Sequence, residues 1–241
     1  MSVKDELSKV RARIREATLA AGREANEVEL IAVSKLQPSA AIREAYAAGQ
    51  RDFGENYVQE LCEKAAELRD LSEIRWHLIG HLQRNKAKKI APLITAIHSV
   101  DSVELVLELG KRVAAAEAER RALLGAERAR LDVLVEVSIA REAQKSGAAP
   151  EDVAKVIEAI EREPSLRLRG LMCVPPMSEQ PEDARPHFEA LVRLRDTLGG
   201  RAHLPELSMG MTADLEVAIA AGATSVRVGT AIFGQRPRPG T

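Results

Sequence analysis

The sequence predicts a single-domain (β/α)8 barrel of the TIM type, with an extra N-terminal helix. Eight short apolar segments alternate with helical segments, a pattern that favours a parallel sheet. These units fit into about 210 residues, which matches a closed barrel better than an open sheet. No G-x-G-x-x-G motif follows the first apolar segment, which weakens the open-sheet alternative. We expect one domain over 1–241, with the helix at about 2–22 and the barrel at about 29–234.

The first helix and the strands are predicted from two different periodicities. Leu7, Val10, Ile14 and Ala17 recur at helical spacing, and Gly22 offers an end to the helix. The strands are predicted at short apolar runs bounded by turn residues. These runs span residues 29–34, 52–56, 76–80, 96–100, 132–139, 168–174, 206–209 and 225–229.

Helical segments are predicted after each of the first seven strands. The first of them runs from Pro38 to Gly49, and the third is a basic helix that ends at Pro92. Apolar stripes at helical spacing mark three others, which carry Val58 to Ala65, Val153 to Ile160 and Phe188 to Leu198.

The remaining two helices are identified by their caps. Asp101 or Ser102 caps a longer helix after the fourth strand, and the charged stretch 115–130 extends it before looping back. Thr212 opens the helix that precedes the last strand.

Composition and charge narrow the class of partner. The net charge is −1, from 35 basic and 36 acidic residues, which argues against nucleic acid or an anionic membrane as the main partner. The basic run 84–89 is favoured as a solvated helix face over a phosphate-binding or partner-binding patch. Cys62 and Cys173 do not make a disulfide framework, and no apolar signal or membrane segment is visible. We therefore expect a cytoplasmic protein.

Lys35 is the first candidate for chemistry. It follows the first strand directly, and the ends of barrel strands build the site. If Ile31 and Val33 face the interior, the alternation of a strand points Lys35 the same way. Desolvation lowers the pKa of a lysine and frees its amine to attack a carbonyl. The alternative is a lysine that extends to the barrel rim.

The last two strands offer a phosphate site. Residues 208–212 link strand seven to a helix, and Gly229 and Thr230 follow strand eight. Glycines, hydroxyl groups and helix N-termini all suit an anion, and barrels often bind phosphate at these two loops. The alternative is that Thr212 only caps its helix and Gly229 only eases a bend.

Arg227 stands inside an apolar strand, where a charge is costly unless it is paired. It could point at the edge of a ring whose phosphate lies in the adjacent loops. The alternative is that it faces the outer helices and pairs with a carboxylate there.

Two other kinds of site are rejected. His77 and His81 lie on a strand, about 13 Å apart, too far to share one metal ion, and no Cys or His cluster has zinc spacing. A Ser–His–Asp hydrolase is poorly supported because the G-x-S-x-G motif is absent.

Five motifs resemble the pyridoxal phosphate homeostasis proteins. They occur in the order of that family and extend over nearly the whole chain. They are Ile31 to Lys35, Phe53 to Tyr57, Trp76 to Lys86, Leu207 to Thr212 and Val226 to Gly234.

The resemblance implies a barrel like the N-terminal domain of alanine racemase, holding pyridoxal 5′-phosphate (PLP) as an aldimine, a Schiff base, on Lys35. It implies that Ser208, Thr212, Gly229 and Thr230 surround the phosphate and that Arg227 faces the pyridine nitrogen. Asn56 and His77 would line the pocket. The expected cofactor-binding set is thus Lys35, Asn56, His77, Ser208, Met211, Thr212, Arg227, Gly229 and Thr230.

Two functions fit these residues: a PLP carrier without turnover, acting in vitamin B6 homeostasis, and a PLP-dependent amino-acid racemase or decarboxylase. The carrier is favoured because the chain ends within a few residues of strand eight, and neither Tyr46 nor Tyr57 is placed as an opposing acid. Arg227 would also disfavour a protonated pyridine nitrogen. A cofactor-free aldolase would leave the phosphate loops unexplained. We expect a monomer with no catalytic residues, whose partners are PLP and apo-enzymes that require it.

Overall fold

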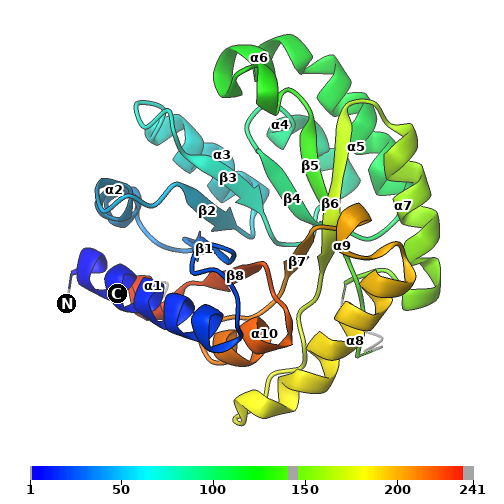
Figure 1. Cartoon of the computed structure of the whole chain (residues 1–241). Helices are drawn as coiled ribbons and strands as arrows, with labels where there is room; N and C mark the ends of the chain where they lie inside the picture. The colour runs from blue at the N-terminus through cyan, green and yellow to red at the C-terminus, as the bar shows by residue number, and fades with distance from the viewer. Residues whose placement is uncertain (1, 141–145, 236–241) are drawn as a thin grey trace.

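The computed structural model describes residues 2–140 and 146–235, and within them eight parallel strands close into a barrel. The order is sequential, and β8 pairs back onto β1. This confirms the predicted fold class, with helices around the outside of the barrel (Figure 1). The strands are β1 (Glu29–Val33), β2 (Asp52–Glu55), β3 (Arg75–Leu78), β4 (Ala96–Val100), β5 (Leu131–Glu136), β6 (Leu166–Met172), β7 (Glu206–Ser208) and β8 (Ser225–Val228).

Helix α1 precedes the barrel, as predicted. Ser2 caps it by accepting a hydrogen bond from the backbone N–H of Asp5 at 3.1 Å, and Leu7, Val10 and Ile14 are buried. It lies beside α10 (Figure 1). The α-helices are α1 (Val3–Ala20), α2 (Ser39–Ala47), α3 (Val58–Glu67), α4 (Ala87–Ile90), α5 (Val103–Ala115), α6 (Glu117–Leu124), α7 (Val153–Arg162), α8 (Arg185–Thr197), α9 (Gly200–His203), α10 (Leu215–Ala221) and α11 (Thr230–Phe233).

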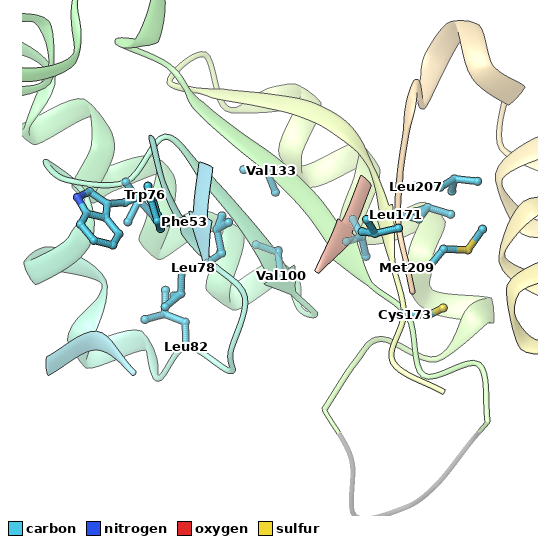
Figure 2. Close-up of a cluster of buried hydrophobic side chains, with 14 of the residues drawn as sticks. Phe53, Trp76, Leu78, Leu82, Val100, Val133, Leu171, Cys173, Leu207 and Met209 are labelled. Carbon is cyan, nitrogen blue, oxygen red and sulfur yellow. The ribbon is translucent and has the colours of Figure 1, made fainter. Parts of the chain in front are cut away.

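The main hydrophobic cluster contains the strand residues that alternate toward the helices. Phe53 and Trp76 belong to it, with ring centroids 6.0 Å apart, and Figure 2 shows part of this cluster. Leu30 and Ala32 of β1 also belong to it, whereas Ile31 and Val33 are buried outside it. Strand alternation therefore turns Ile31 and Val33 into the barrel interior, which is the condition under which Lys35 points the same way.

Two helix predictions need correction, at Thr212 and over residues 115–130. Thr212 does not open a helix: α10 begins at Leu215, and Asp214 closes the preceding turn by accepting the backbone N–H of Met211 at 2.6 Å. The stretch 115–130 is not one extension, because α5 ends at Ala115 and α6 ends before Gly125. Gly125 has φ 87°, a conformation in which glycine avoids the steric cost of a Cβ.

The helix formed by the basic run 84–89 is also shorter than predicted. A 3₁₀ turn over Arg84–Lys86 leads into the single turn of α4. The side chains of Lys88 and Lys89 are exposed, as a solvated face requires, while Ala87 and Ile90 are buried.

Among the residues described, no helix is long and apolar enough to cross a membrane, and no group of three or more His, Cys, Asp or Glu could hold a metal ion. Cys62 and Cys173 are both free. Burial raises the pKa of the Cys173 thiol to about 12, so this thiol stays protonated at neutral pH.

Candidate functional site

A cavity of about 320 Å³ lies at the carboxyl ends of the strands, where barrel sites are expected. This volume is in the range of small-molecule sites. Most of its walls come from segments that immediately follow strands. Its lining consists of Val33, Lys35, Gln37, Asn56, Ile79, Val174, Met211, Thr212, Ala213, Arg227, Gly229, Thr230 and Gly234.

Lys35 reaches this cavity because it continues the alternation of β1. Val33 and Lys35 both line the cavity, whereas Ser34 between them is fully buried. A turn follows at once, in which the backbone N–H of Gln37 donates to the Ser34 carbonyl at 3.0 Å. Lys35 therefore lines the cavity, as the alternation of the strand predicts, and it is partly exposed.

Arg227 also faces the barrel interior. It lies on β8 opposite Ile31 of β1, and only 4% of its surface is exposed. Its Nη1 donates to Ser208 Oγ at 2.6 Å and its Nη2 to the Cys173 carbonyl at 2.9 Å. Burial lowers its pKa, but a guanidinium remains charged at neutral pH. The alternative orientation toward the outer helices is wrong.

A chain of buried hydrogen bonds leads from Arg227 down through the barrel. Ser208 Oγ lies 2.9 Å from His98 Nδ1, and His98 Nε2 lies 3.0 Å from His77 Nδ1. His77 Nε2 is 3.1 Å from Asp52 Oδ1. With both imidazoles neutral, one tautomer of each ring lets every group donate to the next, from the guanidinium to the carboxylate. The chain links the cavity to the amino-terminal end of the barrel.

The protonation states of the groups in this chain depend on burial and on the charged groups beside them. Burial and the neighbouring His77 lower the pKa of His98 well below its ordinary value, so His98 is neutral. Burial alone would lower the pKa of His77, but its contact with Asp52 raises it overall. Burial alone would raise the pKa of Asp52, but hydrogen bonds from His77 and Arg75 lower it overall.

The lowered pKa of Asp52 predicts a stability that depends on pH. Because the folded-state pKa is depressed, this stabilisation is present above the unfolded value of about 4 and is lost as the pH falls further. We expect Asp52→Asn to lower the free energy of unfolding by about 2 kcal/mol at pH 6, and by less below about pH 4. Urea unfolding at several pH values measures this difference. Asp196→Asn, which changes an exposed carboxylate on α8, is the control, and a constant difference across the pH range would contradict the prediction.

The loop between β7 and α10 forms one side of the cavity. Gly210 has φ 94°, and a Cβ there would lie 2.5 Å from the Cβ of Ala218, so glycine is required by both conformation and space. The turn that follows presents Met211 and Thr212 to the cavity. Arg13 of α1 donates to the Thr212 carbonyl at 3.1 Å, which ties the loop to the N-terminal helix.

The loop after β8 forms the adjoining side. A Cβ on Gly229 would lie 3.0 Å from the Val33 carbonyl oxygen, so this glycine lets the loop approach the end of β1. Helix α11 starts at Thr230 and makes a single turn, in which the N–H groups of Ile232 and Phe233 donate to the Gly229 carbonyl at 2.9 Å. Thr212 and Thr230 line the cavity beside this turn, and their hydroxyl groups suit a phosphate group.

Asn56 lines the cavity just beyond β2, and its position depends on Gly80. A Cβ at residue 80 would lie 2.4 Å from the backbone oxygen of Asn56, a distance that no side chain permits. The side-chain Oδ1 of Asn56 is buried without a hydrogen-bond partner in the described residues. This oxygen is available to a ligand.

The structure divides the predicted site residues into two groups. His77 and Ser208 do not line the cavity; they lie in the buried chain beneath Arg227. Sequence reasoning missed His98, although its place in a buried strand was a usable signal. The residues that line the cavity as predicted are Lys35, Asn56, Met211, Thr212, Arg227, Gly229 and Thr230.

Comparisons with known proteins agree with this architecture. Residues 6–237 match the family model of the alanine racemase N-terminal domain. The chain is 47% identical over 236 residues to the pyridoxal phosphate homeostasis protein of Pseudomonas aeruginosa, covering 98% of this chain and 96% of that protein. This chain belongs to the pyridoxal phosphate homeostasis protein family.

Solved structures place this family member among barrels of the same shape. PipY of Synechococcus elongatus with PLP bound is 36% identical, with a TM-score of 0.78, covering 97% of this chain and all (100%) of PipY. Alanine racemase from Corynebacterium glutamicum is 17% identical, with a TM-score of 0.63; the match covers 98% of this chain and 63% of the racemase. At that identity the racemase shows the shared fold alone.

Proposed function

We propose that this chain binds PLP as an aldimine on Lys35 and acts as a cytoplasmic carrier in PLP homeostasis, without a turnover reaction of its own. The observation that carries the proposal is that Lys35 and Arg227 line one cavity together with the loops after β7 and β8. The PLP-bound structure of PipY supports the choice of cofactor. We also propose that the protein acts as a monomer and supplies apo-enzymes that require PLP.

The groups that line the cavity fit the chemistry of PLP. The cofactor supplies an aldehyde, and Lys35 supplies the amine that an aldehyde requires. Thr212, Thr230 and the N–H groups beside Gly229 suit its phosphate. Arg227 suits the edge of its ring, and the buried Oδ1 of Asn56 can accept a hydrogen bond from a ring substituent.

The same lining supports a carrier over a racemase or decarboxylase. Among the described residues that line the cavity, the titratable side chains are Lys35 and Arg227. Tyr46 donates to Glu73 at 3.1 Å instead, and Tyr57 is 54% exposed and does not line the cavity. Racemisation needs a second acid on the opposite side of the substrate, and the described lining offers none. A charged guanidinium at the ring nitrogen also weakens the ring as an electron acceptor.

Two assays of the PLP-loaded protein test the carrier proposal. Incubation with single amino-acid enantiomers, followed by chiral chromatography, is expected to give no exchange beyond that of free PLP. Incubation with an apo-enzyme that needs PLP is expected to restore the activity of that enzyme. Rapid formation of the opposite enantiomer would establish the racemase instead.

Arg227→Ala is expected to weaken the binding of PLP about 10- to 100-fold, because it removes a buried charged donor at the ring. Calorimetric titration with pyridoxine 5′-phosphate, which has an alcohol in place of the aldehyde, measures this loss apart from any bond to Lys35. Arg227→Lys keeps the charge and is expected to lose less. Unchanged affinity together with a large gain in turnover would contradict the prediction.

A further inference from the structure

A buried ionic cluster lies directly behind Lys35, outside the cavity. Lys64 of α3 is only 5% exposed. Its Nζ donates to the Ser34 carbonyl at 2.6 Å, to Glu55 Oε1 at 2.7 Å and to Glu60 Oε1 at 2.6 Å. A lysine is rarely buried without a purpose, because its desolvation is costly.

The cluster holds the chain on both sides of Lys35. Before it, Ser34 Oγ donates to Glu55 Oε1 at 2.7 Å, and the Ser34 carbonyl accepts from Lys64. After it, the backbone N–H of Leu36 donates to Glu60 Oε1 at 2.5 Å. The two residues that flank Lys35 in the sequence are therefore fixed by the same three charged side chains.

The backbone at Leu36 needs such a support. Leu36 has φ 60°, and among the described residues it is the one non-glycine with a positive φ. This left-handed conformation is unfavourable for a residue with a Cβ. The Leu36 side chain is 46% exposed, so core packing does not hold it in place. Besides the turn that the Gln37 N–H closes on the Ser34 carbonyl, the hydrogen bond from the Leu36 N–H to Glu60 Oε1 supports this conformation.

The cluster is poorly arranged for stability alone. Glu55 Oε2 and Glu60 Oε2 are buried without hydrogen-bond partners in the described residues. Burial raises the pKa of Glu55, although Lys64 opposes that shift. Well-packed apolar residues often stabilise a fold as much as a buried ion pair does. A gain in geometric precision accounts for the cluster better than a gain in stability.

We propose that Glu55, Glu60 and Lys64 are positioning residues that fix the turn around Lys35 and so aim its amine into the cavity. This inference rests on the proposed function, because it assigns the cluster to bond formation with the PLP aldehyde. The bond forms between Lys35 Nζ and the aldehyde carbon, and the aldehyde oxygen leaves as water. None of the three positioning residues touches the cofactor in this scheme; they act through the backbone of residues 34–36.

Glu60→Ala tests the proposal. We expect the second-order rate constant for appearance of the Schiff-base absorption band to fall about tenfold, because a misplaced nucleophile reacts slowly. Pyridoxine 5′-phosphate cannot form the bond. Its affinity, measured by calorimetry, is expected to stay within about twofold of wild type, a change below 0.5 kcal/mol, because Glu60 does not line the cavity. Glu60→Gln keeps an acceptor oxygen for the Leu36 N–H and is expected to recover most of the rate.

Two further variants complete the comparison. Glu63→Ala changes an exposed carboxylate on the same helix and is expected to behave as wild type. Ser34→Ala removes only the hydroxyl that donates to Glu55, so it serves if Glu60→Ala does not fold. Its rate constant is expected to fall about threefold, less than that of Glu60→Ala, because the backbone contacts remain.

The possible outcomes separate this inference from the proposed function. If wild type forms a reducible band and both Glu60→Ala and Ser34→Ala form it as fast, the positioning role is overturned. It is equally overturned if affinity for pyridoxine 5′-phosphate falls in parallel with the rate, which would indicate a general loss of the cavity. If wild type itself forms no reducible band on Lys35, the proposed function falls as well.

Discussion

Lys35→Ala protein is expected to retain no covalently bound PLP after borohydride reduction, whereas wild type retains a stoichiometric amount on Lys35. The reason is geometric: Lys35 is the amine among the described residues that line the cavity. Absorption spectra before and after borohydride, with mass mapping of the modified peptide, measure the difference. The loss is expected to be complete, since no other described lysine side chain lines the cavity.

The fold of Lys35→Ala is expected to remain intact, because the residue lies beyond the end of β1 and is only partly buried. Thermal unfolding followed by circular dichroism checks this. Lys88→Ala, which changes an exposed lysine on α4, is the matched control and is expected to bind PLP as wild type does. A reducible adduct that persists on Lys35→Ala and maps to another lysine would sink the assignment.

Arg120→Met is expected to lower the free energy of unfolding by about 3–5 kcal/mol, because it leaves several buried carbonyls without a donor, each of which costs about 1–3 kcal/mol. Arg120 of α6 is fully buried. Burial lowers its pKa to about 10, so it stays charged at neutral pH. Its guanidinium donates to five backbone carbonyls, those of Ala91, Ile94, Arg128, Ala129 and Arg130.

Methionine has a similar length but cannot donate, so the substitution leaves those carbonyls buried without a partner. Urea unfolding measures the loss as a change in midpoint at constant slope. Arg121→Met is the matched control, because Arg121 is exposed and pairs with Glu117, four residues earlier. A loss for Arg120→Met no larger than that for Arg121→Met would show that the carbonyl contacts contribute little.

The two predictions differ in how much of their basis could be predicted from the sequence. The eight strands were predictable because short apolar runs bounded by turn residues are local signals, and Lys35 was predictable because it follows one of them. The seven-residue helix α10 was harder to bound, since Thr212 and Asp214 are both good caps and only the turn geometry decides between them. Arg120 resembled the exposed arginines around it, because its five acceptors are backbone groups without a sequence signal.

The sequence alone determined the fold class, the order of the strands and most of the residues that line the cavity. The strands follow from short apolar runs, the helices from a period of 3.6 residues, and the cavity residues from their places at strand ends or from the family resemblance. The tertiary structure decided the contacts that barrel closure creates. His98 meets Ser208 across 110 positions in the chain, and Glu60 reaches Leu36 across 24. Only when the strands pair in register do such side chains come within hydrogen-bond distance, because no local pattern brings them together.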